Sequence, residues 1–209
     1  MDFLHFIGDF QSNTEAHRRH NMMIFPYPYI GISEDTLSPE DCSYIISFFE
    51  SKHSHHIHEN KPQVKMRSLI RPSLYGSFKG MHDRILGVLK KGYSEYTEKY
   101  DQCDRNFDEH FEEFWKIQRS DAGKGFLVWH HEQGGKKGAI GRYLVWMIYL
   151  NEDIHGGETE FEGYGKVSPK VGRLVIWPAS FVGAHRGCEI RSGSKYIMTG
   201  WWRFKENHQ

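Results

Sequence analysis

The feature that most constrains the fold is a series of short β-rich runs between residues 113 and 204, separated by glycine-containing turns. The runs are FWKIQRS, FLVWHHE, YLVWMIYLN, ETEFEGY, GRLVIWPA, GAHRGCEI and KYIMTGWWRF. Several short strands with turn signals between them are typical of a β-sandwich or a barrel. This part of the chain is therefore predicted to form an antiparallel jelly roll.

Two helices are predicted before these strands. Ser38 can cap a helix that begins at Pro39, and Asp41 stands at the capping-box spacing. A second helix is predicted over residues 77 to 100, with an apolar stripe of Phe78, Met81, Ile85, Val88, Leu89 and Tyr96. The fold class is therefore α+β and mainly β. One domain over residues 1–209 would place N-terminal packing helices (about 35–105) against a jelly-roll core (about 113–204).

Composition and motifs exclude several classes of protein. Hydrophobic residues make up 38%, charged residues 26%, and the formal net charge is zero, which suits a globular protein with no general attraction to nucleic acid or membrane. The three cysteines stand far apart without a CxxC pair, so we expect reduced thiols and a cytoplasmic location. The sequence has neither a signal-peptide pattern, a membrane-length apolar run nor a nucleotide-binding motif. None of these features predicts the oligomeric state.

The stretch VWHHEQ suggests a metal site. Alternate side chains of a strand share one face, so His130 and Glu132 are expected to project together, with His131 turned away. Such a pair is common and weak evidence alone. A third candidate ligand, His185, stands in VGAHRG on another predicted strand. Two histidines and one carboxylate are the facial triad of non-haem Fe(II) oxygenases, which leaves three octahedral positions open. His131 fits less well than His130, because it lacks a carboxylate two residues on.

Lys195 adds a separate indication. It stands at the start of the last predicted strand, past the RSGS turn, where a hairpin can return it towards the metal site. Its ammonium group can pair with the remote carboxylate of a ligand that the metal holds. An exposed edge lysine is the ordinary interpretation, which the apolar surroundings KYIMTGWW make less attractive. Arg191, in the preceding turn, is the nearest competitor for that carboxylate.

The ordered set HHE, GGETEF, PKVGRLVIWPA, GAHRG and GSKYIMTGW resembles the Fe(II)- and 2-oxoglutarate-dependent oxygenases of the prolyl 4-hydroxylase type. The resemblance covers roughly residues 113 to 204 and implies a double-stranded β-helix. It implies that His130, Glu132 and His185 hold Fe(II). It further implies that Lys195 anchors the C5 carboxylate of 2-oxoglutarate and that Thr159 lines the cosubstrate pocket.

The resemblance also implies a reaction and a substrate. The cosubstrates are 2-oxoglutarate and O2, with ascorbate as a further candidate, and the products include succinate and CO2. The substrate carbon that gains a hydroxyl is expected on a prolyl residue of a peptide or protein, with a small amino-acid-like molecule as the other candidate. Arg142 and Trp201 match residues that meet the substrate in some members.

Two positions depart from the family pattern. Glu132 stands where aspartate is usual, and the tyrosine common upstream of the first ligand has no clear match in QRSDAGKGFLVWH. The residues that contact the C1 end of 2-oxoglutarate are therefore not assigned. Two other classes fit part of the pattern: a zinc-dependent hydrolase, which uses the same ligand types, and a non-catalytic jelly-roll binding module.

Overall fold

A sheet of seven strands forms the centre of the computed structural model, which describes residues 22–52, 60–61, 64–65, 69–70, 76–103, 115–135 and 139–204. Every pairing in this sheet is antiparallel, and the strand order is β1-β2-β11-β7-β14-β6-β5. The strands are β1 (Ile24–Tyr27), β2 (Ile30–Ser33), β5 (Leu69–Ile70), β6 (Lys116–Asp121), β7 (Arg142–Tyr149), β11 (Leu174–Pro178) and β14 (Ser194–Arg203).

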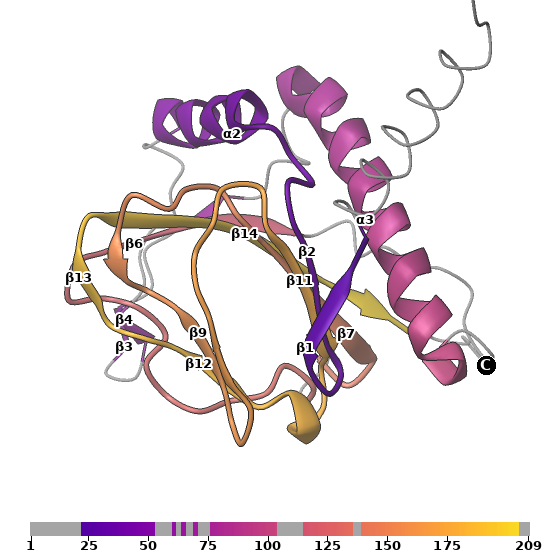
Figure 1. The fold of residues 1–209 in the computed structure, drawn as a ribbon. Helices are drawn as coiled ribbons and strands as arrows, with labels where there is room; N and C mark the ends of the chain where they lie inside the picture. The colour runs from indigo at the N-terminus through magenta and orange to yellow at the C-terminus, as the bar shows by residue number, and fades with distance from the viewer. Residues whose placement is uncertain are drawn as a thin grey trace, which may run out of the picture.

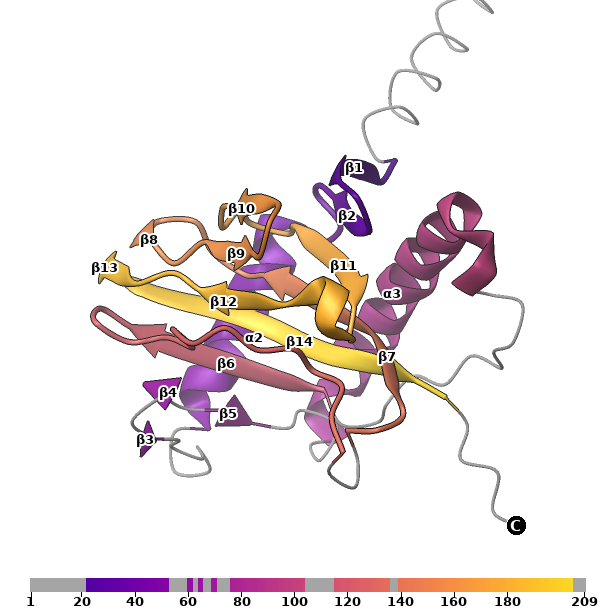
Figure 2. The same ribbon diagram turned by 90° about the horizontal axis from the view of Figure 1, so that it is seen from below.

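Shorter strands form the opposite wall (Figures 1 and 2). One small sheet has the order β10-β9-β12, with strands Gly165–Val167, Thr159–Phe161 and His185–Gly187, and β8 (His155–Gly156) pairs with β13 (Ile190–Ser192). A separate pair joins β3 (Asn60–Lys61) to β4 (Val64–Lys65). The two walls enclose an apolar interior to which β7, β11 and β14 contribute Val145, Met147, Val175, Trp177 and Trp201, and the small sheet Phe161 and Val167. This is the predicted double-stranded β-helix.

The helices cover the outer face of the large sheet (Figure 1). The α2 helix spans Pro39–Ser51 with Ser38 as its cap, and Ser38 Oγ accepts a hydrogen bond from the Asp41 amide at 3.1 Å, as predicted. The α3 helix spans Lys79–Lys99. It is preceded by the 3-10 turn η3 (Gly76–Phe78) and followed by η4 (Asp101–Cys103), so it is slightly shorter than the predicted 77–100.

A second apolar core lies between these helices and the large sheet. Ile45 and Phe49 of α2 and Ile85, Leu89 and Tyr96 of α3 pack against Leu144, Trp146, Ile148, Ile176 and Trp202. Alternate residues of β7 therefore face opposite cores, because successive side chains of a strand point to opposite faces. Among the helices of the described residues, none has the length and apolar character needed to cross a membrane.

The run FLVWHHE was predicted as a strand, and that prediction is wrong. No strand is present between residues 126 and 132, and only an isolated antiparallel bridge joins His130 to His185. The side chains of Val128 and Trp129 are 37% and 40% exposed, so this segment lacks the buried face that stabilises a strand. The run GAHRGCEI is likewise divided, between β12 and β13.

Candidate metal centre and cosubstrate pocket

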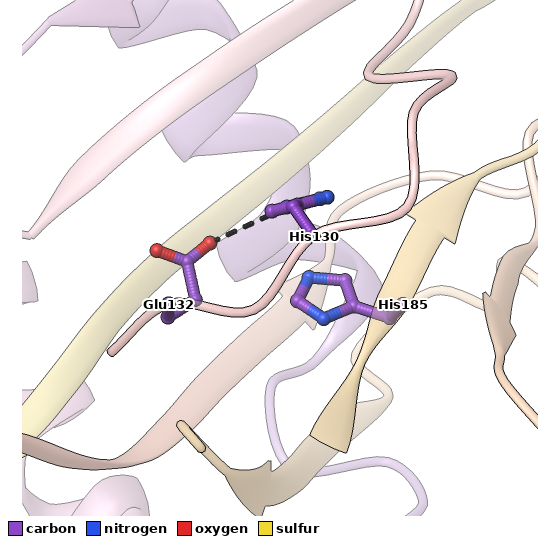
Figure 3. A group of neighbouring side chains, drawn as sticks. All are labelled: His130, Glu132 and His185. Atoms are coloured by element: carbon purple, nitrogen blue, oxygen red, sulfur yellow. Dashed lines mark ion pairs between the residues drawn. The ribbon is translucent and has the colours of Figure 1, made fainter. Parts of the chain in front are cut away.

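Three candidate ligands meet at one end of the β-sandwich. His130 and His185 are held side by side by the isolated bridge, with amide-to-carbonyl distances of 3.0 and 2.9 Å. Glu132 follows His130 in the same segment, and its amide donates to the Ala179 carbonyl at 3.0 Å. One ligand atom from each side chain lies within 4.8 Å of the others. Figure 3 shows the three side chains converging, two from the loop and one from β12.

Hydrogen bonds orient both imidazole rings. Nδ1 of His130 lies 2.9 Å from the Val128 carbonyl, and Nδ1 of His185 lies 2.9 Å from the Gly183 carbonyl. A carbonyl only accepts, so each Nδ1 carries the proton and each Nε2 of the neutral ring presents a lone pair. Metal-binding histidines are commonly held in this way. The donor set of two Nε2 atoms and one carboxylate thus fits Fe(II).

The protonation states also fit a metal. Burial lowers the pKa of His185 to about 4, and the neighbouring charge of His130 acts in the same direction. Burial alone would raise the pKa of Glu132, but the adjacent imidazole groups of His130 and His185 favour the ionised carboxylate and lower that pKa to about 2. At neutral pH the site therefore holds a neutral imidazole at His185 and an ionised carboxylate, the forms that bind metal.

Arg142 and Trp201, expected to meet a substrate, both contact Glu132. Arg142 Nη1 and Trp201 Nε1 each lie 3.1 Å from Glu132 Oε2, and the guanidinium carbon lies 3.6 Å from the centre of the Trp201 ring. The other oxygen, Oε1, lies 3.6 Å from Nε2 of His130. The side chain of His131 is exposed.

A pocket extends from the candidate ligands into the sandwich. Lys195, Thr159 and Trp201 line it together with His130, Glu132 and His185. Lys195 is only 8% exposed, and its Nζ donates to the Gly157 carbonyl at 2.7 Å. Burial lowers the pKa of Lys195 to about 8. An ammonium group has three donors, so Lys195 retains capacity for an anion in the pocket. The competitor Arg191 is exposed on β13 and does not line the pocket.

Gly157, in the GGET segment, leaves room for the side chain of Lys195 in the pocket. Gly157 has a positive φ of 75°, which glycine adopts readily. A Cβ at this position would lie 3.2 Å from Cδ of Lys195, so a larger residue would crowd the lysine chain. Two residues on, Thr159 Oγ1 lies 2.7 Å from the buried Tyr149 hydroxyl.

Sequence reasoning left two polar residues of the pocket without an assigned role. Gln118 and Ser120 of β6 are 7% and 8% exposed and line the pocket, and Ser120 pairs with Lys195 in the β6–β14 ladder. They belong to the segment in which no equivalent of the family tyrosine was found. The signal was present in the sequence, because polar residues two apart in a strand share one face.

Comparisons with known proteins agree with this geometry. The family model of the 2OG-Fe(II) oxygenase superfamily matches residues 115–203. No curated protein sequence matches the chain. A viral collagen prolyl hydroxylase from Paramecium bursaria Chlorella virus-1, solved with 2-oxoglutarate, superposes with a TM-score of 0.65 at 20% identity over 85% of this chain and 97% of that one.

Two further solved structures show the same fold. A Pseudomonas putida prolyl-4-hydroxylase has a TM-score of 0.65 at 15% identity, over 85% of this chain and 94% of that one. A Trichoplax adhaerens prolyl hydroxylase, in complex with a hypoxia-inducible factor peptide fragment, has a TM-score of 0.70 at 12% identity, over 93% of each chain. Residues 115–203, which match the family model of the 2OG-Fe(II) oxygenase superfamily, contain the paired histidines, the carboxylate and the buried lysine, and the chain has the double-stranded β-helix fold of these solved prolyl hydroxylases.

Proposed function

We propose that this protein is an Fe(II)- and 2-oxoglutarate-dependent dioxygenase that hydroxylates a prolyl residue of a peptide or protein. In this proposal His130, Glu132 and His185 hold Fe(II), and Lys195 binds the C5 carboxylate of 2-oxoglutarate. The observation that carries it is that the triad and a buried lysine line the same pocket. Bound Fe(II) supplies the oxidation, in which 2-oxoglutarate and O2 yield succinate, CO2 and a hydroxyl on the substrate carbon.

The residues of the pocket have separate tasks. The Nδ1 hydrogen bonds fix the two imidazole rings, so that little reorganisation is needed when the metal binds. Lys195 offers a positive charge in a place sheltered from water, where its attraction for a carboxylate is strong. Thr159, buried against Tyr149, shapes the wall beside the cosubstrate. We propose that Arg142 and Trp201 border the substrate side, although both contact Glu132.

Apolar side chains around the ligands support a macromolecular substrate. Val128 and Trp129 precede the first ligand, and Phe181 and Val182, in the 3-10 turn η5 (Phe181–Gly183), precede the last; all four are exposed. The ring of Trp129 is held by Arg186, whose guanidinium carbon lies 4.7 Å from the ring centre. Exposed apolar groups next to a site are typical of surfaces that bind proteins or peptides. A free amino acid would leave this surface unused.

A turnover screen tests the proposal. The protein would be supplied with Fe(II), 2-oxoglutarate, O2 and ascorbate against proline-containing peptides, with mass spectrometry used to detect the gain of one oxygen atom and the release of succinate. His130→Ala, Glu132→Ala and His185→Ala should each abolish both. Oxidation of a free amino acid but of no peptide would contradict the peptide substrate.

The same screen addresses the alternatives. A zinc hydrolase would cleave peptides with Zn(II) and leave 2-oxoglutarate unchanged, and it gives no role to the buried Lys195. A binding module would turn over nothing. The cytoplasmic location and the lack of a nucleic-acid partner stay predictions from the sequence.

A further inference from the structure

The carboxylate of Glu132 has two oxygens with different surroundings. Oε1 lies on the side of His130, 3.6 Å from its Nε2. Oε2 accepts two hydrogen bonds at 3.1 Å each, from Arg142 on β7 and from Trp201 on β14. Arg142 Nη1 also lies 3.4 Å from the Glu132 backbone carbonyl. One oxygen is thus held by the large sheet, while the other faces the histidines.

The two donors support one another. Trp201 is 6% exposed, and the guanidinium group of Arg142 stacks on its ring at 3.6 Å. Lys116 of β6 lies 5.2 Å from the same ring centre. Stacking fixes the plane of a guanidinium group, so that its hydrogen bonds lose less side-chain entropy than those of a free arginine. The pair therefore forms a rigid donor site built on neighbouring strands of the sheet.

Glutamate needs such a restraint more than aspartate does. It has one more rotatable bond, so its carboxylate can turn to bind a metal through both oxygens. Two histidines and one oxygen leave three of six octahedral positions for cosubstrate and O2, whereas a bidentate glutamate leaves two. Hydrogen bonds to a ligand residue orient it in this way in many metal sites.

We propose that Arg142 and Trp201 are positioning residues that act through Glu132: they hold Oε2, so that the longer carboxylate presents Oε1 alone to the metal. This inference rests on the proposed assignment of Glu132 as a metal ligand. Arg142 and Trp201 would hold Glu132 in this way before a substrate binds, and this role is separate from any contact that they make with a substrate.

Cobalt binding in the absence of O2 and substrate tests the inference. Trp201→Phe keeps the ring and removes the donor, and Arg142→Gln removes the charge and the stacking. Each should weaken Co(II) affinity about 10–100-fold and alter the visible ligand-field bands that report the coordination number. Arg142→Lys should keep part of the affinity, because a lysine can still donate to Oε2. Trp202→Phe, next on β14 but in the core beneath the helices, should leave Co(II) affinity unchanged.

A double-mutant cycle shows whether the effect passes through Glu132. In a Glu132→Ala background, Trp201→Phe and Arg142→Gln should no longer change the residual Co(II) affinity of the two histidines. Wild-type protein that binds no Co(II) would overturn the proposed metal site itself. Wild-type binding with unchanged affinity and spectra in both variants would overturn the positioning role alone. Variants that raise only the KM for a peptide would make the pair substrate contacts and contradict the inference.

Discussion

Replacing Lys195 with methionine removes the charge of the proposed 2-oxoglutarate anchor while keeping an unbranched apolar chain. The lowering of the lysine pKa from 10.5 to about 8 corresponds to roughly 3 kcal/mol for keeping the cation in the empty pocket. A carboxylate that enters the pocket gains this cation as its partner, and removing one member of a buried charge pair costs about 2–5 kcal/mol. At about 3 kcal/mol, the Kd for 2-oxoglutarate should rise about 150-fold.

The assay is an anaerobic titration of the Fe(II)-loaded protein with 2-oxoglutarate, followed by the charge-transfer band of the chelate. Fe(II) affinity should stay close to that of wild type, because Lys195 bonds to the Gly157 carbonyl and to none of the ligand side chains. Arg191→Gln is the matched control, since Arg191 is exposed and outside the pocket. If Lys195→Met bound 2-oxoglutarate as tightly as wild type, Lys195 would not be the anchor. If only Arg191→Gln lost affinity for 2-oxoglutarate, Arg191 would be the anchor instead.

Three further predictions concern the pH dependence of 2-oxoglutarate binding, the role of His131 and the stability of α3. The affinity for 2-oxoglutarate should fall as pH rises above about 8, because the free protein then loses the Lys195 proton, and Lys195→Arg should flatten this profile in titrations across that pH range. His131→Ala should bind Fe(II) as wild type does, because the side chain is exposed; a loss like that of His130→Ala would place His131 in the site instead. Alanine substitutions at two glycines of α3 should change the free energy of unfolding, measured in urea, in opposite directions. Gly87→Ala has open space and should stabilise by about 0.5–1 kcal/mol. Gly92→Ala should destabilise, because its Cβ would lie 2.5 Å from Leu174 Cδ2 and overpacking typically costs about 1–3 kcal/mol.

The strands that could be predicted are those whose residues are buried on both faces. The runs around β7, β11 and β14 are nearly continuous in apolar residues because they separate two cores. Such a pattern is strong enough to be recognised without knowing which strands pair. The sequence indicated the short strands of the opposite wall, but not where each begins and ends. The strands β9 and β12 are only three residues long, and their ends are set by the strands that they pair with.

His130 and Glu132 lie together as expected, but the reason given for it, a strand through both residues, is wrong. His130 and Glu132 were expected together because alternate residues of a strand share a face, yet no strand forms there. The two side chains meet because the backbone is pinned at both residues, His130 to His185 and the Glu132 amide to Ala179. Hydrophobic and β-branched composition predicted a strand at Val128 and Trp129. Composition does not reveal whether an ordered partner runs alongside, and here the partner segment supplies only one bridge.

The contacts of Arg142 and Trp201 lie further beyond sequence reasoning. They meet because β7 and β14 are neighbours, with Trp201 opposite Val145 and Arg203 opposite Arg142, and because the register shifts between Trp202 and Arg203. A shift of one residue in a ladder redirects every side chain beyond it. The residue types show that both side chains can donate hydrogen bonds, but the sequence does not reveal that both donate to Oε2 of Glu132. An aspartate in place of Glu132 would end one methylene short of the same donors, so Arg142, Trp201 and the longer ligand must be considered as one feature of this site.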